Sequence, residues 1–364
     1  MARDTIPARL LERSAARGEE PAHFVKENGA WHATSWATYA RDVHRAAKSL
    51  LALGIERGDG IALLGGNRPE WSLVLLSALS VGAHGIGLLT QSTPAELRAT
   101  LAHSRPRLLL VEDEQLFARV RAELPPSLVR VVFMAGAPAP VHELASSWAA
   151  FLELGATVAD ARVPACVEAL VPDELAVVVY TSGSEGAPQA VKLSHRNLTW
   201  TCDVLRDVLR VGPRDTSVSF LPLAHIAEQL FTVHGPVTTG SAVYYAESLS
   251  RAPANLREVQ PTLVFAVPRI WEKLQEGMEQ KLAREHGARS ALVAWARDVG
   301  RRVIEIKNAG CEPALELSVQ YELARALVLA KAQRALGLAN ARICLCGAAP
   351  VDDEVLRFFA TLGI

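Results

Sequence analysis

The chain has 364 residues, enough for about two or three packed subdomains. Hydrophobic residues make up 50% and charged residues 21%, and the mean hydropathy is +0.15, a balance that excludes a disordered chain and is typical of a globular enzyme. The formal net charge of −1 excludes recruitment of nucleic acid or an anionic membrane by an overall positive field.

The N-terminus, Met-Ala-Arg-Asp-Thr-Ile-Pro, lacks the apolar segment of a signal peptide, which favours a cytoplasmic location. The five cysteines are odd in number and have no disulfide spacing, as suits a reducing compartment. Only Cys344 and Cys346 are close together, and no second Cys or His pair completes a zinc site. We expect both to be buried free thiols on a strand.

The first half of the chain alternates short apolar runs with amphipathic stretches, the pattern of an α/β fold. The predicted strands are Ile61–Leu64, Gly85–Leu89, Leu108–Val111, Val129–Met134 and Ala176–Thr181. The predicted helices are Arg41–Leu53, Pro69–Ser80, Pro94–His103 and Val141–Leu152. Because parallel strands need crossover helices, this half indicates one mostly parallel sheet flanked by helices.

One uncharged stretch, Ser72–Leu89, is just long enough to cross a membrane. It is interrupted by Gly82, His84, Gly85 and Gly87, so a helix, a turn and a buried strand fit it better than a single membrane-spanning helix.

A second series of elements follows in the rest of the chain. The predicted strands are Ser217–Leu221, Ala242–Ala246, Thr262–Ala266 and Arg342–Cys346. The predicted helices are His225–Thr232, Arg251–Glu258, Pro268–Gln280, Ser290–Lys307 and Leu315–Leu336. The last two are rich in Ala, Leu, Glu and Arg, which is typical of surface helices. In the first half, Ala135–Pro140 is predicted to be a surface loop.

The most informative segment runs from Val177 to Asn197. A β-branched strand ending at Thr181 is followed by glycines and small hydroxyl residues, and Ser194 is a good N-cap for the next helix. Glycines let the backbone turn tightly and bring several N–H groups onto one anion, so such a loop can hold the phosphates of a nucleotide. The Walker and nucleophile-elbow spacings are absent. A plain surface turn is the alternative on composition alone.

Residues 180–197 read Tyr-Thr-Ser-Gly-Ser-Glu-Gly-Ala-Pro-Gln-Ala-Val-Lys-Leu-Ser-His-Arg-Asn. This string resembles the phosphate-loop signature of the adenylate-forming superfamily, which holds acyl-CoA synthetases, luciferases and peptide-synthetase adenylation domains. The resemblance implies that the nucleotide phosphates are bound by Thr181, Ser182, Gly183, Ser184, Glu185, Gly186, Gln189 and Lys192.

Several positions depart from that signature. Ser184-Glu185 stands where the family has two threonines, Gln189 where it has lysine, and Ala190 where it has glycine. A carboxylate repels a polyphosphate, and a missing ammonium removes an attraction of about 4 kcal/mol, before desolvation, for a unit pair ~4 Å apart. On a strand, Lys192 would face the other way from Gln189. We therefore expect weak triphosphate binding.

Two further strings resemble the long-chain fatty acyl-CoA synthetases of that superfamily. They are Leu-Pro-Leu-Ala-His-Ile-Ala-Glu, at residues 221–228, and Val-Pro-Arg-Ile-Trp-Glu-Lys, at residues 267–273. The first implies that His225 is the catalytic residue shaping the carboxylate and acyl-adenylate pocket, at the carboxyl end of a strand. A structural histidine is the alternative. We expect Glu228 on a helix surface or beside a cation, and Trp271 in helix packing.

Gly347, Ala348, Ala349 and Pro350 resemble the segment that lies against the adenine of ATP in that superfamily. Small residues suit this role because a flat base must approach the backbone closely. The Asn-Arg-Pro-Glu-Trp string at 67–71 also matches a family turn, and we expect it to be structural.

The resemblance implies an α/β fold of two helix-flanked, mostly parallel β-sheet subdomains. We predict subdomain A at 46–200, with the phosphate loop at its end, and subdomain B at 1–45 plus 201–364, cut at Ile364. The barrel subdomain and the C-terminal domain of the superfamily are missing from these residues. So are the glutamate that holds magnesium and the aspartate that grips ribose, and the metal ligands therefore stay unknown.

The implied activity is ATP-dependent conversion of a long-chain fatty acid to acyl-adenylate and then to acyl-CoA. Its cofactors and partners are ATP, Mg²⁺, coenzyme A and the fatty acid, with no nucleic acid, and peripheral membrane contact stays open. We expect these 364 residues alone to be unable to complete the cycle. Two alternatives are a non-catalytic homologue that binds acyl chains or adenylate, and a fatty acyl-AMP ligase that loads a carrier protein.

Overall fold

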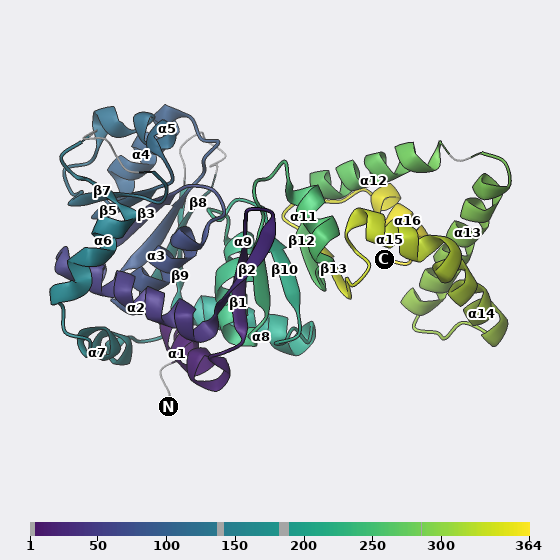
Figure 1. Cartoon of the computed structure of the whole chain (residues 1–364), viewed down its shortest axis with the longest axis horizontal. Helices are drawn as coiled ribbons and strands as arrows, with labels where there is room; N and C mark the ends of the chain where they lie inside the picture. Colours follow the sequence, from purple (N-terminus) through teal and green to yellow (C-terminus); the bar gives the residue numbers. More distant parts are fainter. Residues whose placement is uncertain (1–3, 137–141, 182–188, 285) are drawn as a thin grey trace. The chain divides into compact units, whose positions relative to one another are not determined.

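The computed structural model describes residues 4–136, 142–181, 189–284 and 286–364 (Figure 1). Contacts between residues divide the chain into two units: unit 1 holds residues 1–214 and 219–248, and unit 2 holds 215–218 and 249–364. From the sequence we instead predicted one subdomain at residues 46–200 and a second from the remaining residues. The two divisions differ because unit 1 contains strands from the two largest sheets of the chain. The predicted subdomains correspond more closely to separate sheets, and they stay a prediction.

The larger sheet has seven strands in the order β7-β6-β5-β3-β4-β8-β9, all paired in parallel except β8 and β9. Its strands are β3 (Gly60–Leu64), β4 (His84–Leu88), β5 (Leu108–Val111), β6 (Arg130–Phe133), β7 (Ala145–Ser147), β8 (Leu175–Thr181) and β9 (Gln189–Ser194). The mostly parallel sheet expected for this half of the chain is confirmed.

Helices cover both faces of this sheet (Figure 1). Because successive strand residues point to opposite faces, Ile61 and Leu63 belong to one core and Ala62 and Leu64 to another. The first core includes residues of α1 (Ile6–Arg17), α2 (Trp36–Ala52), α3 (Pro69–Ser80), α6 (Trp148–Leu154) and α7 (Arg162–Ala169). The second includes residues of α4 (Pro94–Ser104) and α5 (Glu114–Ala118).

The uncharged stretch Ser72–Leu89 forms the end of α3, a turn and β4, as predicted. Within the ranges that the structure describes, no helix is both long and apolar enough to span a bilayer.

The predicted helix Val141–Leu152 is wrong at the start of its described part but right at its end: Ala145–Ser147 form β7, and the residues from Trp148 onward belong to α6. Ser146 and Ser147 pair in parallel with Val132 and Phe133, and so extend the sheet as β7. The helix α6 begins only after this strand, because the Ser147 hydroxyl accepts a hydrogen bond from the Ala150 N–H (3.2 Å) and caps it.

A second sheet has the order β10-β11-β1-β2. Its strands are β1 (Pro21–Glu27), β2 (Ala30–Ser35), β10 (Thr216–Ser219) and β11 (Ala242–Tyr245), and the boundary between the units falls within β10. The hairpin of β1 and β2 was not predicted. Unit 1 also contains α8 (His195–Val208), α9 (Ile226–Gln229), a π-helical turn (Leu230–His234) and α10 (Gly235–Thr239).

Unit 2 holds the parallel pair β12 (Leu263–Ala266) and β13 (Ile343–Cys346). Its helices are α11 (Ala252–Val259), α12 (Pro268–Leu282), α13 (Ala288–Asn308), α14 (Leu315–Ala324), α15 (Ala330–Leu336) and α16 (Asp353–Thr361). The predicted helix Leu315–Leu336 is interrupted by a π-helical turn at Arg325–Leu329. Cys344 and Cys346 are free thiols on β13, but they are only partly buried, contrary to our expectation.

Candidate functional site

The hairpin of β8 and β9 brings two predicted phosphate-binding residues together. Thr181 is the last residue of β8 and pairs with Gln189, the first residue of β9, and both are exposed. Because β8 runs parallel to β4, this end of the hairpin lies at the carboxyl edge of the sheet, where α/β folds bind ligands. The intervening Ser182, Gly183, Ser184, Glu185 and Gly186 lie outside the described residues.

Lys192 is not brought to this end of the hairpin. It pairs with Val178 and lies three residues along β9 from Gln189, or roughly 10 Å at ~3.3 Å per residue. Its charge acts instead near the amino end of β4: burial lowers the pKa of His84 there, and Lys192 lowers it further. The position of Lys192 therefore gives no support for its replacing the missing lysine at Gln189.

The turn of residues 220–225, here called the His225 turn, rests on the same edge of the sheet. A Cβ atom on Gly87 would lie 2.7 Å from the Cα of Ala224, so the two backbones are in close contact. Gly87 is in turn the neighbour of Val179 on β8. The exposed His225 precedes α9, and its N–H donates to the Pro222 carbonyl (3.0 Å). The structure thus places His225 and Thr181 on one edge.

Glu228 corrects one expectation from the sequence. Its side chain is buried, with 3% exposed, instead of lying on a helix surface. Its carboxylate accepts hydrogen bonds from the hydroxyls of Ser219 (2.7 Å) and Thr232 (2.9 Å). Burial raises the pKa of Glu228 to about 7, although these hydrogen bonds oppose the shift.

Asn67 is a second residue at this contact, partly buried, that the sequence did not single out as functional. Its amide donates to the Ser219 hydroxyl (2.8 Å) and to the Leu221 carbonyl (2.7 Å), and so joins the loop after β3 to the His225 turn. Asn67 belongs to the Asn-Arg-Pro-Glu-Trp string that matched the family, but its contacts could not be predicted because its partners, Ser219 and Leu221, are distant in sequence.

The predicted adenine-side residues follow β13 and belong to unit 2, whereas Thr181 and His225 belong to unit 1. Ala348, Ala349 and Pro350 are exposed, and Ala348 has a positive φ of 71°. A Cβ atom on Gly347 would lie 3.3 Å from the Phe265 ring. The segment is therefore a tight turn of small residues, and its predicted role at the adenine stays a prediction.

The residues that the structure describes form no metal-binding cluster. Within these residues, no group of three or more His, Cys, Asp and Glu side chains is arranged to hold a metal ion. We therefore assign no metal ligand in this part of the chain.

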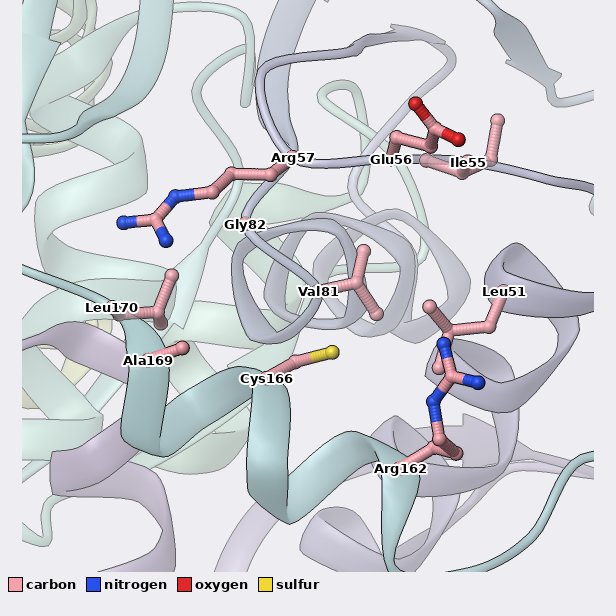
Figure 2. A pocket seen from close by; sticks show the side chains of 10 residues that line it. All are labelled: Leu51, Ile55, Glu56, Arg57, Val81, Gly82, Arg162, Cys166, Ala169 and Leu170. Atoms are coloured by element: carbon pink, nitrogen blue, oxygen red, sulfur yellow. The ribbon is translucent and has the colours of Figure 1, made fainter.

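A cavity of about 240 Å³ lies elsewhere in unit 1 (Figure 2). Its lining includes Ile55 and Gly82, which precede β3 and β4, so it lies toward the amino edge of the sheet. Figure 2 shows the thiol of Cys166, on α7, among its lining side chains. No candidate site residue lines this cavity.

Comparison with known proteins agrees with the family suggested by the sequence. The profile of the family described as AMP-binding enzyme matches residues 11–364. The chain is 31% identical to the long-chain-fatty-acid–CoA ligase ACSBG2 of Homo sapiens over 99% of this chain and 54% of that protein. It is 32% identical to the ligase ACSBG1 of Macaca fascicularis over 99% of this chain and 50% of that protein. The chain thus spans about half the length of these relatives.

Solved structures show the same fold at lower identity. The inhibitor-bound N-terminal domain of FACL13 from Mycobacterium tuberculosis superposes with a TM-score of 0.67 at 18% identity, covering 98% of this chain and 73% of that one. The A-PCP didomain of carboxylic acid reductase from Segniliparus rugosus, in complex with AMP, gives a TM-score of 0.72 at 17% identity, covering 99% and 51%. With the family profile matching nearly the whole length, the chain belongs to the AMP-binding enzyme family.

Proposed function

We propose that this chain is the front part of an enzyme that uses ATP to activate a long-chain fatty acid, first as acyl-adenylate and then as acyl-CoA. The observation that carries the proposal is the shared edge of the large sheet, which holds the Thr181–Gln189 end of the hairpin and the His225 turn. The relatives named as long-chain-fatty-acid–CoA ligases support the substrate class.

In the first half-reaction, a carboxylate oxygen of the fatty acid attacks the α-phosphorus of ATP. The bond from that phosphorus to the bridging oxygen breaks, and pyrophosphate leaves. In the second, the thiol of coenzyme A attacks the acyl carbon, AMP leaves with the electron pair of the C–O bond, and the thiol proton passes to solvent. The protein's task is to position the reactants and stabilise developing charge.

Each candidate residue has a distinct part in this proposal. The His225 imidazole donates a hydrogen bond to the acyl carboxylate or carbonyl oxygen. The Thr181 hydroxyl and the loop that follows it hold the phosphates, and the Gly347–Pro350 turn lies against the adenine. Magnesium accompanies ATP without an assigned ligand here. A cytoplasmic location is part of the same proposal.

Calorimetry tests the site directly with hexadecanoyl sulfamoyl-adenosine, a non-hydrolysable acyl-adenylate analogue. We expect the protein to bind it, and His225→Ala to weaken that binding roughly tenfold, as the loss of one good hydrogen bond does. The control is His32→Ala, because His32 is an exposed residue on β2. No binding by the unaltered protein, or equal binding by His225→Ala, would contradict the proposal.

A second candidate function is a binding module without turnover. It is favoured by Gln189, which stands exposed at the end of the hairpin where the family has lysine. ATP–pyrophosphate exchange separates the two: exchange that depends on the fatty acid supports the enzyme. Absence of exchange in the protein with all its domains, together with tight analogue binding, supports the module. An assay with a carrier protein in place of coenzyme A tests the acyl-AMP ligase alternative.

A further inference from the structure

The backbone of the His225 turn is held by two buried side chains that follow it in the sequence. The backbone N–H groups of Phe220 and Leu221 lie toward the carboxyl group of Glu228 and stabilise its charged form. The side-chain amide of Gln229 donates to the carbonyl of Leu223 (2.9 Å). Glu228 is 3% exposed and Gln229 is 0% exposed, so water does not compete for these contacts. Most of the turn is therefore tied to α9.

Other polar groups complete the surroundings of Glu228. Its Oε1 accepts from the hydroxyls of Ser219 (2.7 Å) and Thr232 (2.9 Å), and the Asn67 amide lies 3.2 Å away. The same Asn67 amide donates to the Leu221 carbonyl (2.7 Å). These hydrogen bonds can all form only while the turn follows this path. Another path would leave a buried polar group without a partner, which costs free energy.

The partners of Glu228 distinguish it from a residue that only fills space. The largest stabilising contacts of its carboxyl group are hydroxyl and backbone N–H groups, not a cation. Both N–H groups belong to the first two residues of the His225 turn. An apolar side chain of similar volume would pack there but would offer no acceptor to the hydroxyls of Ser219 and Thr232 or to the amide of Asn67.

We propose that Glu228 is a positioning residue that fixes the His225 turn, and with it the His225 side chain, at the carboxyl edge of the large sheet. Glu228 acts through the backbone and does not touch the substrate. The effect of Glu228 on acyl-adenylate affinity rests on the proposed function, whereas its effect on the conformation of the turn does not.

The test compares Glu228→Gln with Ser77→Ala in the complete protein. Ser77 is a matched control because it is also buried and hydrogen-bonded, to the carbonyls of Val43 (2.9 Å) and Leu73 (2.7 Å), in the helix α3. Hydrogen exchange of the Phe220 and Leu221 amides and the NMR resonances of the His225 imidazole report on the turn. Calorimetry with hexadecanoyl sulfamoyl-adenosine reports on the site.

We expect Glu228→Gln to speed exchange of both amides by roughly tenfold or more, to shift the His225 resonances and to weaken analogue binding by roughly tenfold. Ser77→Ala should lower stability without these three changes. If Glu228→Gln does not fold, Thr232→Val, which removes one hydroxyl donor to Oε1, should give smaller changes of the same kind.

Unchanged amide exchange and an unmoved His225 signal in a folded variant would overturn the proposal, as would equal changes in Ser77→Ala. If the unaltered protein does not bind the analogue, the proposed function fails. The exchange and NMR results then decide by themselves whether Glu228 positions the turn.

Discussion

The Cα atom of Ala224 rests against Gly87, so that a methyl group on Gly87 would lie 2.7 Å from it and 3.2 Å from the Ala224 carbonyl oxygen. This contact joins the His225 turn to β4, a central strand of the large sheet. Both atoms are backbone, so neither can move aside as the end of a flexible side chain would. The close spacing between the His225 turn and the sheet therefore depends on the absence of a side chain at Gly87.

Gly87→Ala should therefore displace the turn or destabilise the fold by about 1–3 kcal/mol, the usual cost of overpacking. The urea midpoint and the affinity for the acyl-adenylate analogue measure the two effects. Gly277→Ala is the control: Gly277 is exposed within α12, and nothing lies within 4 Å of an added Cβ. It should stabilise the protein by about 0.5–1 kcal/mol. Equal midpoints and affinities for Gly87→Ala and the unaltered protein would refute the close contact.

The second prediction concerns the missing positive charge at Gln189. Gln189→Lys should raise the affinity for ATP, because it returns an ammonium group to the end of the hairpin next to Thr181. An increase of about tenfold is reasonable for a partly screened pair. Val191→Lys is the matched control, since it adds the same charge on the same strand face, two residues further along β9.

Calorimetry with ATP measures both variants at low and high salt. The gain in Gln189→Lys should shrink at high salt, and Val191→Lys should show a smaller gain. If both lysines raise affinity equally, the effect is general electrostatics, and the predicted role of position 189 is wrong.

Much of the fold could be predicted because its signals are local. Leu108–Val111 and Pro69–Ser80 were predicted with their observed bounds, since an apolar run and a proline at the first helical position both act within a few residues. The hairpin at residues 21–35 also had a local signal: Asn28-Gly29, with φ of 50° and 81°, forms its turn. That signal was missed because apolar and polar residues are mixed in the flanking strands, which therefore contain no long apolar run.

The candidate site was harder to predict because its contacts are not local. His225 and the β8 strand were identified from motif resemblance, but Asn67 and Glu228 are far apart in sequence and meet only in the folded chain. The buried carboxyl group of Glu228 contacts Ser219 on β10 and Asn67 after β3, a combination that no single segment encodes. The π-helical turn that interrupts Leu315–Leu336 could not be predicted either, because this stretch contains no glycine or proline.

A third prediction concerns the ion pair that joins α1 to α8. The two terminal guanidinium nitrogens of Arg9 donate to the Asp203 carboxylate (2.9 Å each), and the Arg9 side chain is 12% exposed. Arg9→Met should destabilise the protein by about 1.5–3 kcal/mol, because Asp203 then keeps only Arg206 (3.0 Å) as a charged partner and Asp4 also loses its ion pair with Arg9. The exposed pair of Arg41 and Asp42 (3.5 Å) is the comparison, and Arg41→Met should cost less than about 1 kcal/mol. Equal urea midpoints for the two variants would contradict this ranking.

The last prediction is a loss of stability at mildly acidic pH caused by buried histidines. Burial lowers the pKa of His23 to about 4, of His195 to about 4 and of His234 to about 3, all from 6.5. Since these folded-state values lie below the unfolded value, each histidine favours the folded protein above pH 6.5, and this contribution is lost as the pH falls toward 4. Glu228 has the opposite effect on stability, because its pKa is raised, but the three buried histidines together outweigh this single group.

His23 isolates this effect because it is enclosed by aromatic rings. Its ring centroid lies 5.0 Å from that of Tyr39 and 5.6 Å from that of Tyr245, and its Nδ1 atom has no hydrogen-bond partner. His23→Phe therefore gives up no hydrogen bond at Nδ1 and removes a group that must charge in acid. Between pH 6.5 and 4, the free energy of unfolding of His23→Phe should therefore fall by up to roughly 3 kcal/mol less than that of the unaltered protein.

Urea midpoints measured from pH 7 to pH 4.5 test this, with His32→Phe as the exposed control on β2. At pH 7 the two variants should differ little from the unaltered protein. At pH 4.5 only His23→Phe should be more stable, because only the buried imidazole resists protonation in the folded state. A parallel fall of all three midpoints would show that carboxyl groups, and not His23, govern acid unfolding.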